Sequence, residues 1–228
     1  MCGRFVLFSS EESLLRVPGF QEVHAPAGLP PARYNVAPTQ IIPILRPGTT
    51  PTEALVEPAR WGLLPHWKKD ESGPPLFNAR AETVTAKPSF RDAFKHSRCL
   101  IPMDGYYEWH TDPETREKTP YWISTGQLVW VAGLWATGLD RLSATMITTA
   151  SRPPLDWVHD RMPRFLLPDE YATWLFGTPN EAATLLHPVG EDLLNSFSVR
   201  PADKAVGNVR NDYPELIAVQ GEPDDGQV

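Results

Sequence analysis

Apolar and polar positions alternate in short runs along most of this chain, which is typical of strands rather than long helices. The middle is the richest part, and Thr125-Gly126-Gln127 fits a hairpin turn between two of its runs. The N-terminal stretch from Gly3 to Phe8 is also strand-like. Predicted strands further along the chain are 41–45, 54–56, 99–109, 121–124, 128–135 and 144–149.

Helical periodicity is confined to short segments. Ser9 and Glu12 are spaced as a capping box before Leu14 and Leu15, which predicts a short helix there. Further helices are expected at 89–94, from Pro168 to Gly177, and from Asn180 to about His187. The 25 prolines are scattered, which favours many turns and short elements.

These elements form no repeat, and no linker divides them. The prediction is therefore a single α+β domain over residues 1–221, with a mainly antiparallel, barrel-like β-sheet core surrounded by short helices. Residues 222–228 are expected to be a disordered acidic tail.

Composition predicts the cellular location of the protein more than it predicts its function. No run of about 18 apolar residues and no basic-then-apolar leader occurs, so neither a membrane span nor a secretory signal is predicted. Two cysteines, Cys2 and Cys99, make no disulfide framework, and Cys99 is expected to be a buried small hydrophobe. A reducing, cytoplasmic location is expected.

The formal net charge of -7 argues against broad attraction to nucleic acid. Basic residues nevertheless gather at 66–69, 91–98 and 161–164. A local basic groove on an acidic protein is compatible with this distribution.

Cys2 is the residue with the most distinctive chemistry. Once Met1 is removed, it carries a free α-amine and a thiol on adjacent carbons. An aldehyde can form an imine with the amine, and the thiol can then close a five-membered thiazolidine in a fast intramolecular step. The alternative is an ordinary cysteine at a frayed terminus, but the strand-like run that follows favours an anchored one.

Three further segments could supply supporting groups, although each has a plainer interpretation. Asn78 and Arg80 share a face if extended, or are a turn amide beside a surface Arg. Glu108 lies between aromatics, a setting that suits general acid–base work if it is buried, or is an exposed carboxylate on the polar face of a strand. His159 and Arg161 lie in a Pro-bounded loop that could be catalytic or a local ion pair.

Tryptophan positions suggest one stacking surface. Trp67, followed by Lys68, is a candidate platform for unpaired bases with a phosphate contact beside it, whereas Trp61 is expected in the core. Metal-ligand spacings and phosphate-binding glycine loops are absent from the sequence, so no metal or other cofactor is predicted.

Taken in chain order, these motifs resemble the SOS response-associated peptidase (SRAP) family over nearly the whole chain, short of the acidic tail. One match alone would be weak, but with cysteine at position 2 the set is highly specific. The matching segments are Met1-Cys2-Gly3-Arg4-Phe5, Arg33-Tyr34-Asn35-Val36-Ala37-Pro38, Trp61-Gly62, Asn78-Ala79-Arg80-Ala81-Glu82-Thr83, Gly105-Tyr106-Tyr107-Glu108-Trp109, His159-Asp160-Arg161-Met162-Pro163 and Val206-Gly207-Asn208-Val209.

The resemblance implies a covalent sensor of abasic sites in single-stranded DNA, which shields the lesion as a thiazolidine and removes its own Met1. It implies that Cys2 is the nucleophile and that Asn78 positions or polarises the reacting groups at the sugar. It also implies that Glu108 and His159 transfer protons. It implies phosphate contacts for residues that include Arg4, Arg80 and Arg161. Some relatives have two adjacent tryptophans where this chain has Trp67-Lys68, so the resemblance extends to the chemistry but not to the details of strand binding.

Two other functions stay open on the sequence alone. One is a thiol autopeptidase or peptidase that uses Cys2, Glu108 and His159 on peptide bonds, and the other is a non-covalent reader of single-stranded or modified DNA. The crosslinking activity is expected to be lyase-like imine chemistry without multiple turnover. The expected protein is a monomer in a bacterial-type cytoplasm, associated with the nucleoid when bound to DNA and in contact with replication or repair machinery.

Overall fold

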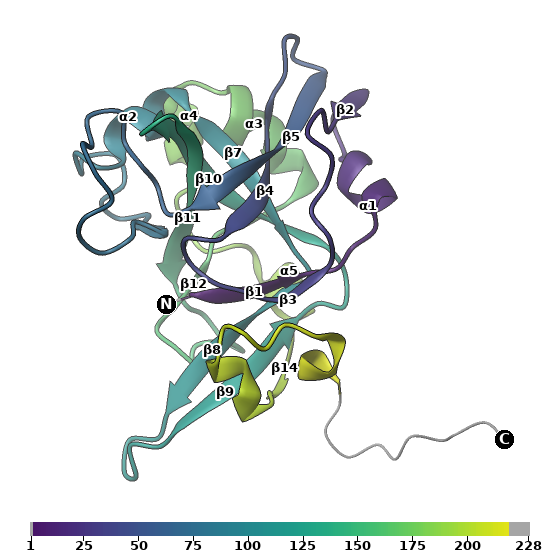
Figure 1. The fold of residues 1–228 in the computed structure, drawn as a ribbon, viewed down its shortest axis with the longest axis vertical. Coiled ribbons are helices and arrows are strands. Elements are labelled where there is room, and N and C mark those ends of the chain that lie inside the picture. Colours follow the sequence, from purple (N-terminus) through teal and green to yellow (C-terminus); the bar gives the residue numbers. More distant parts are fainter. Residues whose placement is uncertain (1, 219–228) are drawn as a thin grey trace, which may run out of the picture.

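The computed structural model describes residues 2–218, and its strands form two sheets (Figure 1). The smaller sheet is five-stranded and contains the N-terminal strand. Its order is β14 (Ser198–Pro201), β9 (Lys118–Ser124), β8 (Gly105–Thr111), β1 (Arg4–Leu7) and β3 (Arg33–Val36). Each neighbouring pair in it is antiparallel. The predicted strand after Gly3 is therefore confirmed, and it lies inside a sheet rather than at its edge.

The larger sheet closes on itself. Along its path the order is β12 (Arg161–Pro163), β11 (Arg141–Ala150), β10 (Val129–Gly138), β7 (Arg98–Met103), β4 (Ile41–Pro47), β5 (Glu53–Trp61) and β2 (Glu22–His24). Because β5 also pairs with β11, the strands β11, β10, β7, β4 and β5 form a ring. The short strands β13 (Phe165–Leu166) and β6 (Asn78–Arg80) add to β10 and β11. The predicted barrel-like core is confirmed.

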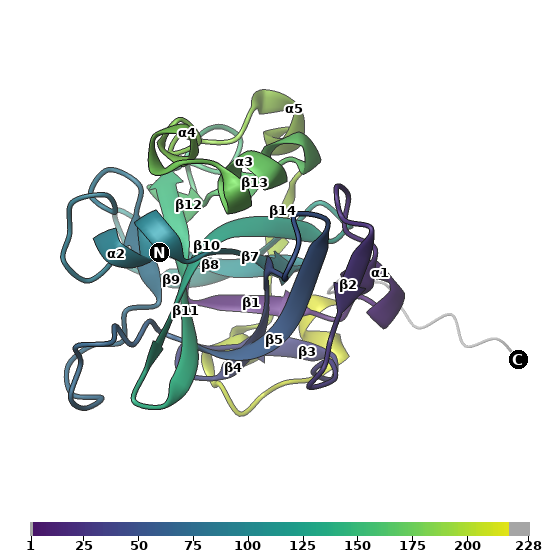
Figure 2. The ribbon, with the colours of Figure 1, turned by 90° about the horizontal axis from the view of Figure 1, so that it is seen from above.

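Short helices surround this barrel, as expected. Figure 2 shows α3 (Tyr171–Phe176), α4 (Pro179–Ala183) and α5 (Glu191–Leu194) gathered on one side, with α1 (Glu11–Leu15) and α2 (Arg91–His96) elsewhere. Turns of 3-10 helix lie at Pro168–Glu170, Lys204–Gly207 and Pro214–Ile217. No helix within residues 2–218 is long and apolar enough to cross a membrane. The tail at 222–228 lies outside the described residues.

Two predicted helix starts were wrong for a common reason, the choice of capping residue. Ser10, not Ser9, caps α1 through its side chain, because Ser9 bonds to Asp104 instead. The segment predicted to run from Asn180 to His187 begins earlier and is shorter, since Thr178 and Glu181 form the capping box that starts α4.

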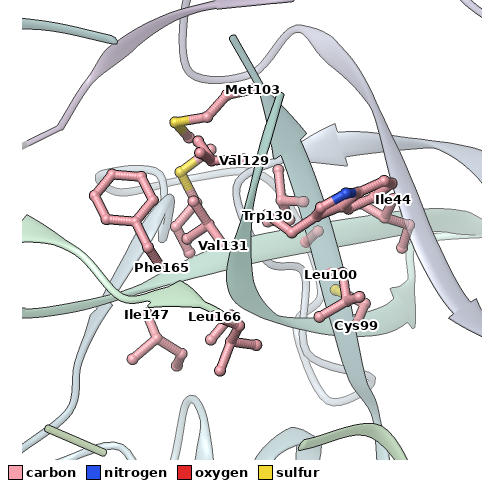
Figure 3. Packing of buried hydrophobic residues seen from close by; sticks show 14 of the residues in the cluster. Ile44, Cys99, Leu100, Met103, Val129, Trp130, Val131, Ile147, Phe165 and Leu166 are labelled. Carbon is pink, nitrogen blue, oxygen red and sulfur yellow. The ribbon is translucent and has the colours of Figure 1, made fainter. Parts of the chain in front are cut away.

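The core lies inside the barrel and continues under the helices. Figure 3 shows side chains of β10, including Val131, packed among Met103, Phe165 and Leu100. A Cβ on Gly133 would come within 2.9 Å of the Cys99 sulfur, so the strands approach closely there. Cys99 is buried as predicted, and both cysteines are free thiols.

Arg164 is a fully buried charge that joins the barrel to the helical side of the molecule. Its guanidinium donates to Glu170 Oε1 at 2.6 Å and to the Leu185 carbonyl oxygen at 2.6 Å. Its backbone N–H donates to the Ile147 oxygen of β11. Since Arg164 directly follows β12, this network also fixes the strand that begins at Arg161.

We expect Arg164→Met to lower the free energy of unfolding by about 3–5 kcal/mol, because Glu170 would lose its charged partner in a largely buried site. Urea unfolding of the two proteins measures the difference. Arg16→Met is the matched control, since Arg16 pairs with Glu12 in solvent and such pairs contribute little. Equal losses in the two variants would contradict the interpretation of the Arg164 network.

Candidate active site

Cys2 lies two residues before the start of β1 and is fully buried. The strand after it is held between two neighbours, with Arg4 opposite Tyr107 of β8 and Phe5 opposite Val36 of β3. At the far end of β1, Asp104 accepts from the backbone N–H of Phe8 at 2.6 Å. The anchored terminus inferred from the sequence is therefore confirmed.

Asn78 binds the backbone of Cys2 directly. Its Nδ2 donates to the Cys2 carbonyl oxygen at 2.7 Å. The strand that carries it, β6, is fixed by parallel pairing to β11, with Asn78 opposite Met146. The other end of the amide, Oδ1, is buried and accepts no hydrogen bond from the described residues. Asn78 thus presents an acceptor beside Cys2 while it positions the Cys2 carbonyl.

Glu108 is the charged group that acts on the Cys2 thiol. Burial raises the thiol pKa, and the negative charge of Glu108 raises it further. The side chain of Glu108 is itself buried, with 4% of the residue exposed, so the alternative of an exposed strand carboxylate was wrong. The thiol is consequently protonated at neutral pH, with a carboxylate close enough to influence it.

His159 and Glu108 both line an open hollow of about 380 Å³. Trp109, Thr111 and Lys118 complete the lining. The Nδ1 atom of the ring lies 3.0 Å from the Arg161 backbone nitrogen and 2.8 Å from Asp160 Oδ1. The four residues predicted to act in catalysis therefore form a continuous series, from Asn78 through Cys2 and Glu108 to His159.

Arg161 and Arg80, the predicted phosphate contacts of this region, lie around Glu82. Arg161 pairs with Glu82 through two hydrogen bonds, of 2.7 and 3.0 Å, and also donates to the Thr148 carbonyl oxygen at 2.6 Å. The hydrogen bond from Arg161 is the main cause that lowers the pKa of Glu82, and the charge of Arg80 lowers it further. Arg80 is exposed. An incoming phosphate would meet Arg80 directly, but would compete with Glu82 for Arg161.

Arg4 is engaged with the protein rather than presented to solvent. It donates to Asn35 Oδ1 at 3.2 Å and to the Val206 carbonyl oxygen at 2.7 Å. Its guanidinium lies 5.8 Å from the centre of the Trp109 ring, and burial lowers its pKa. Its phosphate contact stays a prediction, whereas its role in holding the segment around Val206 is visible.

Trp67 and Lys68 lie in a different part of the surface. Trp67 is 52% exposed and lines two hollows that share no residue with the one at Glu108 and His159. Lys68 donates to the Ser72 carbonyl oxygen at 2.9 Å. Glu71 fastens their loop to Arg60 at 3.0 Å. A stacking role for Trp67 fits its exposure, but it stays a prediction. Trp61 is fully buried, as expected.

Sequence reasoning missed the partner of Arg161. Glu82 lies within the matched segment that begins at Asn78, yet its pairing with Arg161 spans 79 positions and leaves no local signal. Asp160 follows His159 directly, and its carboxylate at the ring is the local ion pair that the sequence offered as an alternative. Among residues 2–218, no group of three or more His, Cys, Asp or Glu side chains is placed to hold a metal ion.

Comparisons with known proteins find relatives over nearly the whole chain. The family model described as SOS response associated peptidase (SRAP) matches residues 1–209. The abasic site processing protein YoqW of Bacillus subtilis is 36% identical, with 95% of this chain and 99% of that protein aligned. The corresponding protein YedK of Escherichia coli is 30% identical, with the same coverage. A crystal structure of a Bordetella bronchiseptica protein shares the fold, with TM-score 0.73, 22% identity and coverage of 89% and 100%.

Proposed function

The chain belongs to the SOS response associated peptidase (SRAP) family, and from this we propose that it processes abasic sites in single-stranded DNA by linking to them through the mature N-terminal Cys2. One observation carries the proposal. Asn78 holds the Cys2 carbonyl while the Glu108 carboxylate lies near its thiol. An aminothiol beside a proton-transfer group is what aldehyde capture requires. The names of the aligned relatives supply the substrate class.

The first step is opening of the abasic sugar, which is mostly a closed hemiacetal. As the C1′–O4′ bond breaks, its electron pair stays on O4′, which takes a proton from His159. The C1′ hydroxyl gives up its proton to water as the aldehyde C=O forms. A residue that gives and takes protons near neutral pH suits this step, and His159 lines the hollow beside Glu108.

Imine formation follows at the Cys2 amine. The amine must be neutral to attack, and the resulting carbinolamine loses its hydroxyl as water once a proton is delivered to it. This proton comes from the carbinolamine nitrogen by way of the Glu108 carboxylate, whose charge already acts on the same residue. This step requires a free α-amine, so removal of Met1 precedes it.

Thiazolidine closure completes the capture. The Cys2 sulfur bonds to the imine carbon and its proton passes to a base, for which Glu108 is placed. Burial keeps the pKa of the thiol high, so little thiolate exists beforehand and proton removal accompanies attack. The closed ring protects the lesion, because an open imine could hydrolyse or promote strand cleavage by elimination.

Removal of Met1 by the protein itself is the second part of the proposal. The same thiol and carboxylate could act on the preceding peptide bond, as an autopeptidase would. Conversion of Met1-bearing protein during incubation, lost in Cys2→Ser, is the expected result. A peptidase with multiple turnover would instead cleave added peptides repeatedly, which the proposal does not expect.

Intact mass spectrometry tests the crosslink. The protein lacking Met1 is mixed with an oligonucleotide from which one uracil has been excised, and with the same oligonucleotide before excision. We expect a denaturant-resistant adduct of one protein and one strand, with the mass of one water lost, only with the excised strand. Binding that leaves no covalent product would support the non-covalent reader and would remove the thiazolidine from the proposal.

Salt should affect capture and binding differently. Initial binding relies on local positive charge and weakens with salt through counterion release, but the covalent product does not dissociate when salt is added. We expect a shallower salt dependence for final crosslink yield than for the affinity of a non-reactive strand. Fluorescence anisotropy and denaturing gels measure the two quantities, and parallel slopes would contradict this expectation.

The setting is also proposed rather than established. A monomer in the cytoplasm, located at the nucleoid when bound to DNA and meeting replication or repair machinery there, fits capture of lesions on exposed single strands.

A further inference from the structure

The Nδ1 atom of His159 lies within hydrogen-bond distance of two groups that require opposite things of it. The Arg161 backbone nitrogen, at 3.0 Å, is a donor and needs a lone pair on Nδ1. Asp160 Oδ1, at 2.8 Å, is an acceptor and needs a proton there. Because a neutral imidazole carries its proton on one nitrogen only, the two contacts favour different tautomers.

The backbone donor is held firmly. Ser151 donates its N–H to the Asp160 carbonyl oxygen at 2.8 Å, and Arg161 pairs with Ala150 across β11 and β12. The Arg161 side chain is fastened in turn to Glu82 and Thr148. The amide therefore stays near the ring as a neutral donor. The Asp160 carboxylate is 83% exposed but contacts Nδ1 as a charged acceptor, and a charge-assisted hydrogen bond is stronger than a neutral one.

The consequence lies at the other ring nitrogen. With the proton on Nδ1, Nε2 has a lone pair and can take a proton from a group in the hollow that His159 shares with Glu108. With the proton on Nε2, the ring cannot accept there. The charged groups around it are Glu108 and Lys118 at the hollow and Asp160 and Arg161 on its own loop.

We propose that Asp160 is a positioning residue that keeps the proton of His159 on Nδ1, so that Nε2 is the atom that gives and takes protons. When the imidazolium gives its Nε2 proton to O4′ of the opening sugar, the Nδ1 proton stays on the ring, hydrogen-bonded to Asp160. The product is the neutral Nδ1–H tautomer, which can take a proton back at Nε2. The crosslinking part of this inference rests on the proposed function, while the tautomer does not.

Nitrogen-15 NMR of the histidine rings, on full-length protein without DNA, measures the tautomer directly. At a pH where the ring of His159 is neutral, we expect the wild type to show substantial protonation at Nδ1. We expect Asp160→Ala to show the Nε2–H form alone, since the Arg161 amide would then be the remaining Nδ1 partner of the two. Asp160→Glu should restore part of the Nδ1–H signal. Identical spectra for wild type and Asp160→Ala would overturn the proposal.

Crosslinking rates supply the second readout. We expect Asp160→Ala to slow capture of an abasic strand by about tenfold, less than the hundredfold or more expected for removal of a general acid–base group itself. Asp160→Glu should recover part of the rate. Asp156→Ala is the matched control, because Asp156 is an exposed carboxylate on the same loop and should change neither rate nor spectrum.

The two readouts separate the possible failures. A shifted tautomer in Asp160→Ala with no crosslinking even in the wild type would refute the proposed function and leave the positioning role of Asp160 intact. Normal crosslinking in Asp160→Ala would refute the role of Asp160 and leave the proposed function intact.

Discussion

Cys2→Ala is expected to abolish the stable adduct with abasic single strands, reducing its yield at least about a hundredfold relative to wild type, since the thiazolidine cannot close without sulfur and capture loses the intramolecular advantage of the second step. The α-amine stays, so a transient imine can still form. The measurement is a denaturing gel with and without borohydride, which reduces imines to stable amines. For Cys2→Ala, only the lanes with borohydride should contain adduct.

Cys99→Ala is the control for loss of a thiol. Like Cys2, Cys99 is fully buried and its pKa is raised by burial, but it lies in β7 within the barrel. It should crosslink as wild type does once folding is verified. Full adduct formation by Cys2→Ala without reductant would show that the aminothiol is not the reactive group.

Glu108→Gln is expected to slow crosslinking by about 10²–10⁴-fold, the range that a positioned proton-transfer group contributes. Glutamine retains the shape of Glu108 but cannot accept the thiol proton or deliver one to the carbinolamine. Because a proton-transfer group serves both directions, dissolution of a preformed adduct should slow as well. Single-turnover time courses of formation, and of exchange onto a competing aldehyde, measure the two rates.

Glu117→Gln is the matched control for that substitution. Glu117 lies on the same hairpin between β8 and β9, but its carboxylate pairs with Lys204 in solvent at 2.9 Å. It should leave both rates unchanged. If Glu108→Gln also left both unchanged, Glu108 would have no part in the mechanism.

Local pattern located most of the long strands, because their buried positions are largely apolar. The run predicted as one strand over 99–109 was wrong, since it forms β7 and β8 in different sheets, and the turn at Thr125–Gln127 joins β9 and β10, which do not pair as a hairpin. The ends of the helices were harder, since neighbouring serines compete as caps and Asp104 removes Ser9 from the competition through a contact 95 residues away. Closure of the barrel depends on the parallel pairing of Ser143 with Arg60. A pairing between strands so distant in sequence has no signature in either one.

The candidate site, like the fold, could be predicted from the sequence only in part. Its chemistry could be inferred because Cys2, Asn78, Glu108 and His159 occur in motifs with a recognisable order. Its electrostatics could not, because they depend on which charges the fold brings together. Arg161 was expected to be available to phosphate, yet the structure provides it with Glu82 as a partner. The sequence therefore supplied the candidates for the reacting groups, and only the fold showed how they are held.

The hydrogen bonds that join Arg4 to the segment at Val206 have a consequence for folding during synthesis. Asn35 Nδ2 lies within hydrogen-bond distance of the carbonyl oxygens of Val206, Asn208 and Asn211, and Arg4 donates to the first of them. On the ribosome, both early side chains lack these acceptors until residues 206–211 have emerged. The strands that carry Arg4 and Asn35 therefore gain these contacts only when a segment more than 170 positions further along the chain has been synthesised.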